Sequence, residues 1–308
     1  MSELNSHKNF DITATFECLG TLLFWTLGPI FITYLSGHID SYTQNFLRYL
    51  IGCLFLLPIL VLSIRKNNFD KNLWLKAIFP AAANLTMQSL YAAGFYYISP
   101  AFLILLLKSS IIWTALFSLI FFLDERPLAK SKRFWLGMIL SIAGLSGVMF
   151  LKKDFAEHTT ITGIFLALGA SLAFAVYAIS AKIAFKKTDS RQAFAVTSIY
   201  TTLGLAILMF KYGNMRESLT LNTWQWSCIV ISGITGISFG HTLYYAAMRR
   251  IGATIPALLL LAQPFTVLAF SYFIFSESLN LFQLFSGIIL IAGSILAILA
   301  QQHLKRTE

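Results

Sequence analysis

Charged residues are scarce in this chain. Only 12% of its 308 residues are Asp, Glu, Lys or Arg, whereas 57% are hydrophobic and the mean hydropathy is +0.73. A soluble domain of this length needs more charge than this to cover its surface. The composition therefore excludes a soluble globular protein and predicts a chain whose solvent is mostly lipid.

Cysteines and cofactor motifs are also few. The three cysteines, Cys18, Cys53 and Cys228, lie inside apolar segments and show no metal-ligand spacing. This pattern gives neither a disulfide framework nor a zinc site. A Walker sequence is missing too, so ATP hydrolysis within the chain is not expected. We expect no cofactor and no metal.

Long apolar runs dominate what remains. Ten of them are separated by short loops, at residues 14–34, 43–64, 73–97, 99–123, 134–151, 161–185, 192–210, 224–248, 252–275 and 281–303. A membrane crossing of this kind is a helix of ~20 residues, because lipid offers the backbone no hydrogen-bond partner. Unbroken runs do not fit the alternating strands of a barrel. The sequence predicts an all-α integral membrane protein with ten transmembrane helices.

An internal repeat divides the chain. Residues 90–123 align without a gap onto residues 243–276, and 10 of these 34 positions are identical. We therefore predict two units, residues 1–152 with spans one to five and residues 153–308 with spans six to ten. An odd number of crossings inverts the second unit in the membrane. Inverted repeats are typical of secondary transporters, whose substrate site lies between the halves near the midplane.

Lysine and arginine are distributed unevenly between the loops. With the N-terminus inside, 17 of the 23 fall on the cytoplasmic side, four fall outside, and Arg48 and Lys108 lie within spans. This bias predicts that both termini are cytoplasmic. The net charge of +10 is thereby explained by topology, so no nucleic-acid partner is expected. The expected partners are the lipid bilayer and a small-molecule substrate. The oligomeric state stays open, and a monomer is compatible with the sequence.

A set of short motifs extends over nearly the whole chain. They are Leu23-Phe24-Trp25-Thr26-Leu27-Gly28, Phe46-Leu47-Arg48-Tyr49, Gly163 to Tyr177 (GIFLALGASLAFAVY), Gln263-Pro264-Phe265, Glu277 and Gly287, with Glu125, Gly137 and Gly144 as the first-repeat counterpart. In these motifs the chain resembles the drug/metabolite transporter superfamily, in its ten-span branch built from two EamA domains. The resemblance implies a transporter in a bacterial cytoplasmic (inner) membrane. It also implies that Trp25, Tyr177 and Gln263 line a central cavity. The chain departs from the family at Lys108-Ser109-Ser110-Ile111, where a proline is common.

Lys108 is the most informative single residue. It lies nine residues into its span, which at ~1.5 Å per residue is near the midplane. A lysine there is energetically costly and points to function, facing a polar cavity rather than lipid. It would bind a carboxylate or phosphate of the substrate, or serve a coupling ion. The competing interpretation is a fixed structural partner, although the spans hold only one acid, Glu17, near the cytoplasmic boundary.

Polar residues also form a stripe in the third span. Asn84, Gln88 and Tyr91 share one helix face. Under the repeat offset, His241 is the equivalent of Gln88, and Tyr244 is the equivalent of Tyr91. Equivalent polar faces from the two halves suit a central cavity, and interhelical hydrogen bonding explains them equally well.

Two charged residues carry a structural interpretation. Glu17 superficially matches the first-span glutamate of small multidrug pumps, but its place near the end of the span favours an interfacial residue. Arg48 is expected to extend toward the outer interface or to neutralise Asp40.

One short pattern in the sequence is typical of an enzyme rather than a transporter. Gly236-Ile-Ser-Phe-Gly240 matches the G-x-S-x-G nucleophile elbow, and His241 follows Ser238 closely. That elbow needs a strand-to-helix turn, whereas this segment is predicted to be helical. We expect a non-enzymatic secondary transporter of a small organic metabolite, amino-acid-like or otherwise anionic or zwitterionic. The alternatives are an exporter of lipophilic compounds and an intramembrane serine hydrolase.

Overall fold

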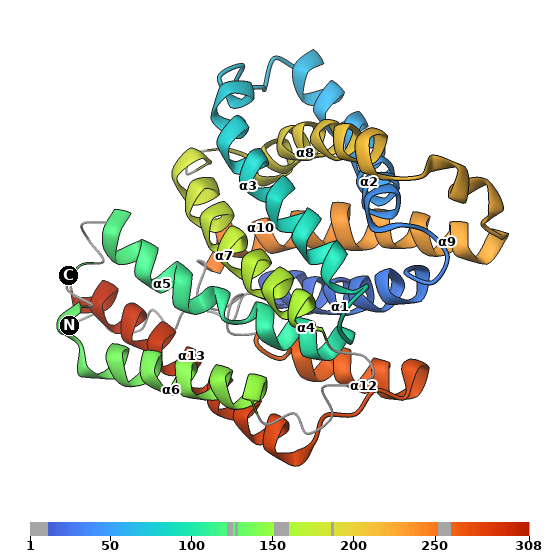
Figure 1. Ribbon diagram of the computed structural model, residues 1–308. Coiled ribbons are helices and arrows are strands. Elements are labelled where there is room, and N and C mark those ends of the chain that lie inside the picture. The colour runs from blue at the N-terminus through green and yellow to red at the C-terminus, as the bar shows by residue number, and fades with distance from the viewer. Residues whose placement is uncertain are drawn as a thin grey trace.

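The computed structural model of the chain consists of helices packed side by side (Figure 1). It describes residues 12–121, 126, 129–150, 160–185, 188–251 and 260–307, and no strand occurs among them. The first half contains α1 (Ile12–Leu35), α2 (Ser41–Arg65), α3 (Leu73–Gly94), α4 (Pro100–Leu107), α5 (Ser110–Phe121) and α6 (Lys132–Phe150). The second half contains α7 (Ile161–Ala184), α8 (Ser190–Tyr212), the 3₁₀-helix η2 (Met215–Thr220), α9 (Thr223–Ser232), the π-helix η3 (Gly233–Phe239), α10 (Gly240–Ile251), α12 (Gln263–Phe275) and α13 (Leu281–Thr307).

Six helical segments in the described part are long and apolar enough to cross a membrane. They are Ile12–Leu35, Ser41–Arg65, Pro100–Phe121, Ile161–Ala184, Ser190–Tyr212 and Thr223–Ala247. Two shorter apolar helices, Gln263–Phe275 and Leu281–Ala297, coincide with the last two predicted spans. The all-helical architecture is thus confirmed, and the six segments correspond to six of the ten predicted crossings.

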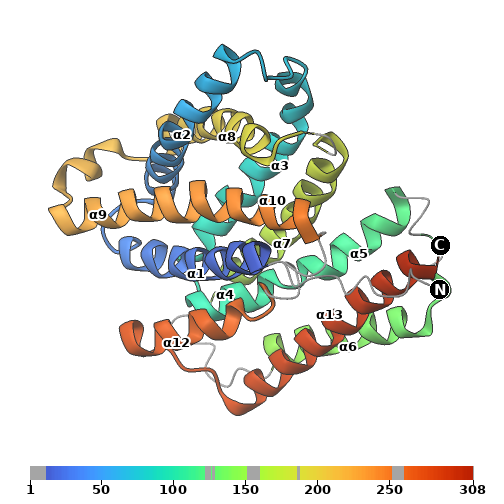
Figure 2. The same ribbon diagram turned by 180° about the vertical axis from the view of Figure 1, so that it is seen from behind.

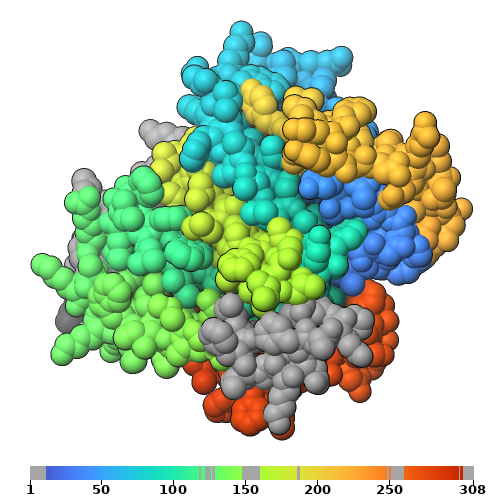
Figure 3. All heavy atoms as spheres, in the orientation of Figure 1, coloured from blue at the N-terminus to red at the C-terminus, as the bar shows by residue number. Residues whose placement is uncertain are grey.

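The helices of the two halves pair with one another. α6 and α13 run side by side along one edge of the molecule in both views (Figures 1 and 2). α8 packs against α2 and α3 on the face shown in Figure 3, so the halves interlock rather than form separate lobes. α3 also packs on α7, and the equivalent pair under the repeat offset, α10 on α1, is in contact as well.

Residues separated by the repeat offset meet at two of these interfaces. Ser141 Oγ lies 3.3 Å from Ser294 Oγ between α6 and α13. Thr202 Oγ1 donates to the carbonyl oxygen of Tyr49 at 3.3 Å between α8 and α2. Equivalent residues touch in this way where a twofold axis passes through an interface. These two contacts are consistent with the internal repeat of the sequence.

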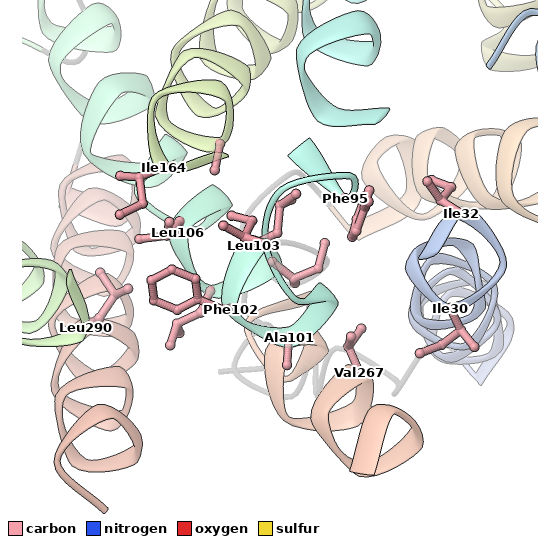
Figure 4. Packing of buried hydrophobic residues seen from close by; sticks show 14 residues of the cluster. Ile30, Ile32, Phe95, Ala101, Phe102, Leu103, Leu106, Ile164, Val267 and Leu290 are labelled. Atoms are coloured by element: carbon pink, nitrogen blue, oxygen red, sulfur yellow. The ribbon is translucent and has the colours of Figure 1, made fainter. Parts of the chain in front are cut away.

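The short helix α4 lies in the interior of the molecule. Seven of its eight residues are buried and Leu107 is partly buried. An apolar sequence on every side of a helix favours such a place. α1, α7, α12 and α13 surround it, and Figure 4 shows Phe102, Leu103 and Leu106 packed among side chains of these helices. This packing holds the end of α4, and with it Lys108, deep within the protein.

Two predicted spans differ from continuous α-helices. The fourth is interrupted at Lys108 and Ser109, between α4 and α5. The eighth is continuous in length but changes to a π-helix over η3, where the backbone hydrogen-bond pattern widens by one residue. In the predicted ninth span, residues 252–259 lie outside the described residues, and so does Glu125 of the family motifs.

Candidate functional site

Lys108 ends α4 and is buried. Its side chain is 9% exposed, and its Nζ donates a hydrogen bond to Gln263 Oε1 at 2.8 Å. The other end of α4 is held by the buried Glu277, whose carboxylate accepts from the backbone N–H groups of Ala101 at 3.1 Å and Phe102 at 3.3 Å. An anion at the start and a cation at the end of a helix both match its dipole. The lysine and the glutamate thus fix this short helix between the two halves.

Gln263 connects Lys108 to the first helix. Its Nε2 donates to the carbonyl oxygen of Trp25 at 2.8 Å, so one amide group contacts α4 and α1 at the same time. Trp25 Nε1 in turn donates to the carbonyl oxygen of Gly236 in η3 at 3.2 Å. A methyl group on Gly240 would lie 2.6 Å from Trp25 Cδ1, so only glycine lets the indole approach this closely.

The indole of Trp25 also contacts two predicted site residues. Its ring centroid lies 5.0 Å from that of His241 and 5.0 Å from that of Tyr244. We call this connected set the Lys108 network, and its members are Lys108, Gln263, Trp25, Gly236, His241 and Tyr244. It joins both halves of the chain.

His241 is held rigidly within this network. Its Nδ1 lies 3.1 Å from the carbonyl oxygen of Ile237 and 3.3 Å from that of Gly236, and its ring stacks on Phe194 at 4.4 Å. The predicted residue Tyr177 joins the same region through a hydroxyl–hydroxyl hydrogen bond to Tyr245. The Tyr245 ring also packs against Phe194, at 6.1 Å.

The predicted stripe on α3 has a different set of contacts. Asn84 is fully buried, and its Nδ2 donates to Tyr49 Oη at 3.2 Å and to Thr201 Oγ1 at 3.0 Å. The carbonyl oxygen of Gln88 accepts from Asn45 Nδ2 at 3.0 Å. These bonds connect α3 to α2 and α8, so Asn84 and Gln88 form a second polar group beside the Lys108 network.

Tyr91, the last member of that stripe, is partly buried. Its ring packs edge-on against Phe95 at 4.9 Å. Its phenol is close enough to interact electrostatically with Arg48.

Arg48 differs from its expected role. It is 2% exposed, its Nε donates to Ser232 Oγ at 3.0 Å, and its Nη1 has no hydrogen-bond partner. Asp40 does not neutralise it, because the Asp40 carboxylate caps α2 through the N–H groups of Tyr42 and Thr43. Eight residues of helix place Arg48 about 12 Å further along α2 than that cap. The prediction of an interfacial or Asp40-paired arginine is wrong, and a buried donor without a partner costs about 1–3 kcal/mol.

Glu17, near the start of α1, forms an ion pair with an arginine. Its Oε1 is 3.2 Å from Arg250 Nε, and the arginine side chain is 44% exposed. The pair joins the start of α1 to α10. This contact agrees with a structural role for Glu17.

The nucleophile-elbow pattern has no matching geometry. Ser238 lies in η3, and its hydroxyl donates to the carbonyl oxygen of Gly52 at 2.9 Å. A strand-to-helix turn does not occur at this π-helix, so Ser238 is not presented as a nucleophile.

One cavity opens at the ends of the helices. It has a volume of about 580 Å³ and is lined by residues of the α2–α3 and α7–α8 connections and of the adjoining helix ends, including Asn68, Asp70, Lys76 and Gln192. Lys76 Nζ donates to Asp70 Oδ2 at 2.9 Å, and this hydrogen bond lowers the pKa of the Asp70 carboxyl below its usual value. The cavity shares no residue with the Lys108 network.

Several polar contacts near the network were not predicted from the sequence. Thr26 Oγ1 lies 2.7 Å from Thr266 Oγ1, again joining α1 to α12. Ser109 Oγ lies 2.7 Å from Ser171 Oγ, next to the break after α4. A signal for Ser109 was available, since it follows Lys108 directly in the motif that departs from the family pattern.

The sequence matches one protein family in two places. Residues 14–150 and residues 161–299 each match the EamA-like transporter family. The chain belongs to this family. Because the family match occurs twice and six helical segments are long and apolar enough to cross a bilayer, this EamA-like chain is a multi-pass membrane protein.

Several named proteins resemble this EamA-like chain. A biotin transporter of Salmonella typhimurium is 21% identical over 76% of the chain and 75% of the relative. An uncharacterized transporter of Archaeoglobus fulgidus is 24% identical over 87% and 90%, respectively. A solved crystal structure superposes with a TM-score of 0.65 and 14% identity, covering 95% of this chain and 98% of the other, which shows a shared fold.

Proposed function

We propose that this EamA-like protein is a secondary active transporter of a small organic solute that carries an anionic or zwitterionic group. One observation supports the substrate class above all others. The buried Lys108 ammonium is hydrogen-bonded to a neutral amide, Gln263, and among the described residues no carboxylate pairs with it. An unpaired cation within a membrane protein is costly, and an anionic group of the solute would offset that cost.

Transport proceeds by alternating access between two inverted five-helix repeats, residues 1–152 and 153–308. Lys108 belongs to the first repeat and Gln263 to the second, so movement of one repeat against the other changes this contact. The proposal includes ten crossings, both termini in the cytoplasm and a location in the bacterial inner membrane. Trp25, Tyr177, His241 and Tyr244 would line the path as polar aromatic surfaces, with Asn84, Gln88 and Tyr91 beside them.

The named relatives agree with the proposed substrate class. Biotin, the solute in the name of four of these relatives, ends in a carboxylate. At 21–22% identity the names support a class of solute rather than one compound. An exporter of lipophilic compounds is a second candidate, since the aromatic rings of Trp25 and Phe194 pack against His241 and the ring of Tyr244 packs against Trp25. Lys108 would then serve the coupling ion.

A ligand screen separates these candidates. Purified protein is unfolded thermally in the presence of carboxylates, zwitterions, neutral metabolites and lipophilic cations, each at several concentrations. A true ligand stabilises the folded state by RT ln(1 + [L]/Kd), so its effect grows with concentration. We expect carboxylate-bearing solutes to stabilise and their neutral amides to have no effect. Stabilisation by lipophilic cations alone would refute the proposed class in favour of the exporter.

A further inference from the structure

Arg48 is a second buried cation in the interior of this protein. Arg48 is 2% exposed. Of its three guanidinium nitrogens, Nε donates a hydrogen bond to Ser232 Oγ at 3.0 Å. Nη1 is buried and without a partner. A guanidinium offers five N–H donors in a fork that matches a carboxylate or a phosphate.

Among the described residues, no acid forms an ion pair with Arg48. The hydroxyls of Tyr91, Tyr49 and Tyr96 and the imidazole of His241 are among the groups near Arg48. Asp40, which precedes α2, is used in the cap of that helix. Tyr91 and His241 are also the residues that the sequence predicts for the substrate site. Arg48 therefore lies among candidate site residues with its charge unneutralised.

Two glycines of η3 lie close to Arg48. A methyl group on Gly233 would lie 2.6 Å from the carbonyl oxygen of Arg48, so glycine is needed for α2 to approach η3. At Gly236 the same methyl group would lie 3.8 Å from Nη2, an ordinary contact distance. π-helical segments such as η3 occur frequently at functional sites. The carbonyl oxygen of Gly236 also accepts from Trp25, which connects this place to the Lys108 network.

We propose that Arg48 forms an anion-binding subsite of the transport pathway, in which its guanidinium binds a carboxylate or phosphate group of the solute. An orphaned acceptor accompanies it, since Asn45 Oδ1 lies three residues earlier on α2 and has no hydrogen-bond partner. A solute with an N–H group beside its acid would satisfy both. The inference rests on the proposed transport function for its biological meaning, but binding can be tested without transport.

The experiment uses acetate and inorganic phosphate as probes. Full-length protein in detergent is unfolded thermally while either anion replaces gluconate at constant ionic strength. The variants are Arg48→Met, Arg48→Lys, Lys108→Met and the control Arg65→Gln, an exposed arginine at the other end of the same helix. We expect a saturable rise in melting temperature for the wild type and for Arg65→Gln, a weaker response for Arg48→Lys and none for Arg48→Met. The more effective of the two anions identifies the group that the subsite accepts.

Three results would overturn the subsite. They are no anion response in the wild type, an undiminished response in Arg48→Met, and a response that only Lys108→Met abolishes. If Arg48→Met does not fold, Arg48→Lys and Ser232→Ala decide, because an unchanged anion affinity in both variants contradicts the inference. Failure of solute uptake together with an intact Arg48-dependent response would contradict the transport proposal and leave the subsite standing.

Discussion

Lys108 combines a structural contact with an unneutralised charge, and the two roles predict opposite effects of its removal. Lys108→Met keeps the length of the side chain and removes the charge. Because the empty site holds a buried cation with only a neutral partner, we expect the variant to be more stable than the wild type by about 1–2 kcal/mol. In thermal unfolding without ligand this is a rise of roughly 2–6 °C. The exposed Lys66→Met is the control, with no expected change. A clear drop in melting temperature would identify Lys108 as a structural residue.

Glu277 is expected to stabilise the folded protein, whereas the charge of Lys108 is expected to destabilise it. Its carboxylate caps α4 from the other half of the chain, through the N–H groups of Ala101 and Phe102. Glu277→Ala leaves these buried donors unpaired, and we expect a loss of about 1–2 kcal/mol in unfolding free energy. Glu277→Gln keeps an acceptor oxygen and should lose less. Equal stability of the alanine variant and the wild type in a denaturant titration would show that the cap is dispensable.

The candidate site residues were those that rarity or family pattern marked in the sequence. Lys108 stands out because charge is rare in apolar segments, and the resemblance pointed to Trp25 and Gln263. The bond between Lys108 and Gln263 joins residues 155 positions apart, and nothing in a single sequence reports such a contact. Arg48 was misjudged for the same reason, since its distance from lipid and water depends on how η3 packs against α2.

At the level of helices, the interface of α6 and α13 depends on close backbone approach. A methyl group on Gly144 would lie 2.7 Å from Leu290 Cα and 2.7 Å from the Ser286 carbonyl oxygen. Backbone atoms cannot move aside as a flexible side chain can. We therefore expect Gly144→Ala to separate the two helices and to lower the melting temperature and the yield of monodisperse protein in size-exclusion chromatography.

The control for this variant is a glycine with free space around it. Nothing lies within 4 Å of a methyl group placed on Gly28 in α1. Gly28→Ala should be neutral or slightly stabilising, by up to about 1 kcal/mol, because alanine favours the helix. Similar effects of both substitutions would mean that helix propensity, and not the α6–α13 contact, decides the outcome.

Helix positions were largely predictable, whereas their interruptions were not. The apolar runs at residues 14–34 and 43–64 coincide closely with α1 and α2. The break after Lys108 and the π-helix η3 lie inside runs whose apolar composition continues on both sides. Hydropathy carries no information about such backbone changes, which arise from packing against other helices.

For the molecule as a whole, the internal repeat predicts two equivalent halves, and the contacts between α6 and α13 are consistent with that prediction. Ser141 and Ser294 occupy equivalent positions and touch, as a shared axis requires. The direction in which the chain crosses the membrane stays a prediction that rests on the distribution of lysine and arginine.

Cysteine labelling tests this orientation. His38→Cys in the α1–α2 connection and Asn68→Cys in the α2–α3 connection place exposed thiols at opposite ends, while the three native cysteines are buried. With the N-terminus in the cytoplasm, an impermeant maleimide added to intact cells should label position 38 and not position 68. Labelling of position 68 alone would reverse the topology.

The central claim is that the protein moves an anionic or zwitterionic solute past Lys108. Its most direct test is uptake into proteoliposomes of a labelled carboxylate identified in the ligand screen, compared with its neutral amide. We expect the wild type to accumulate the acid and to exclude the amide. Lys108→Arg should retain partial uptake, because the charge persists in a different shape. Lys108→Met should lose the preference for the acid over the amide. Equal uptake of acid and amide by the wild type, or an unchanged rate and preference in Lys108→Met, would contradict the claim.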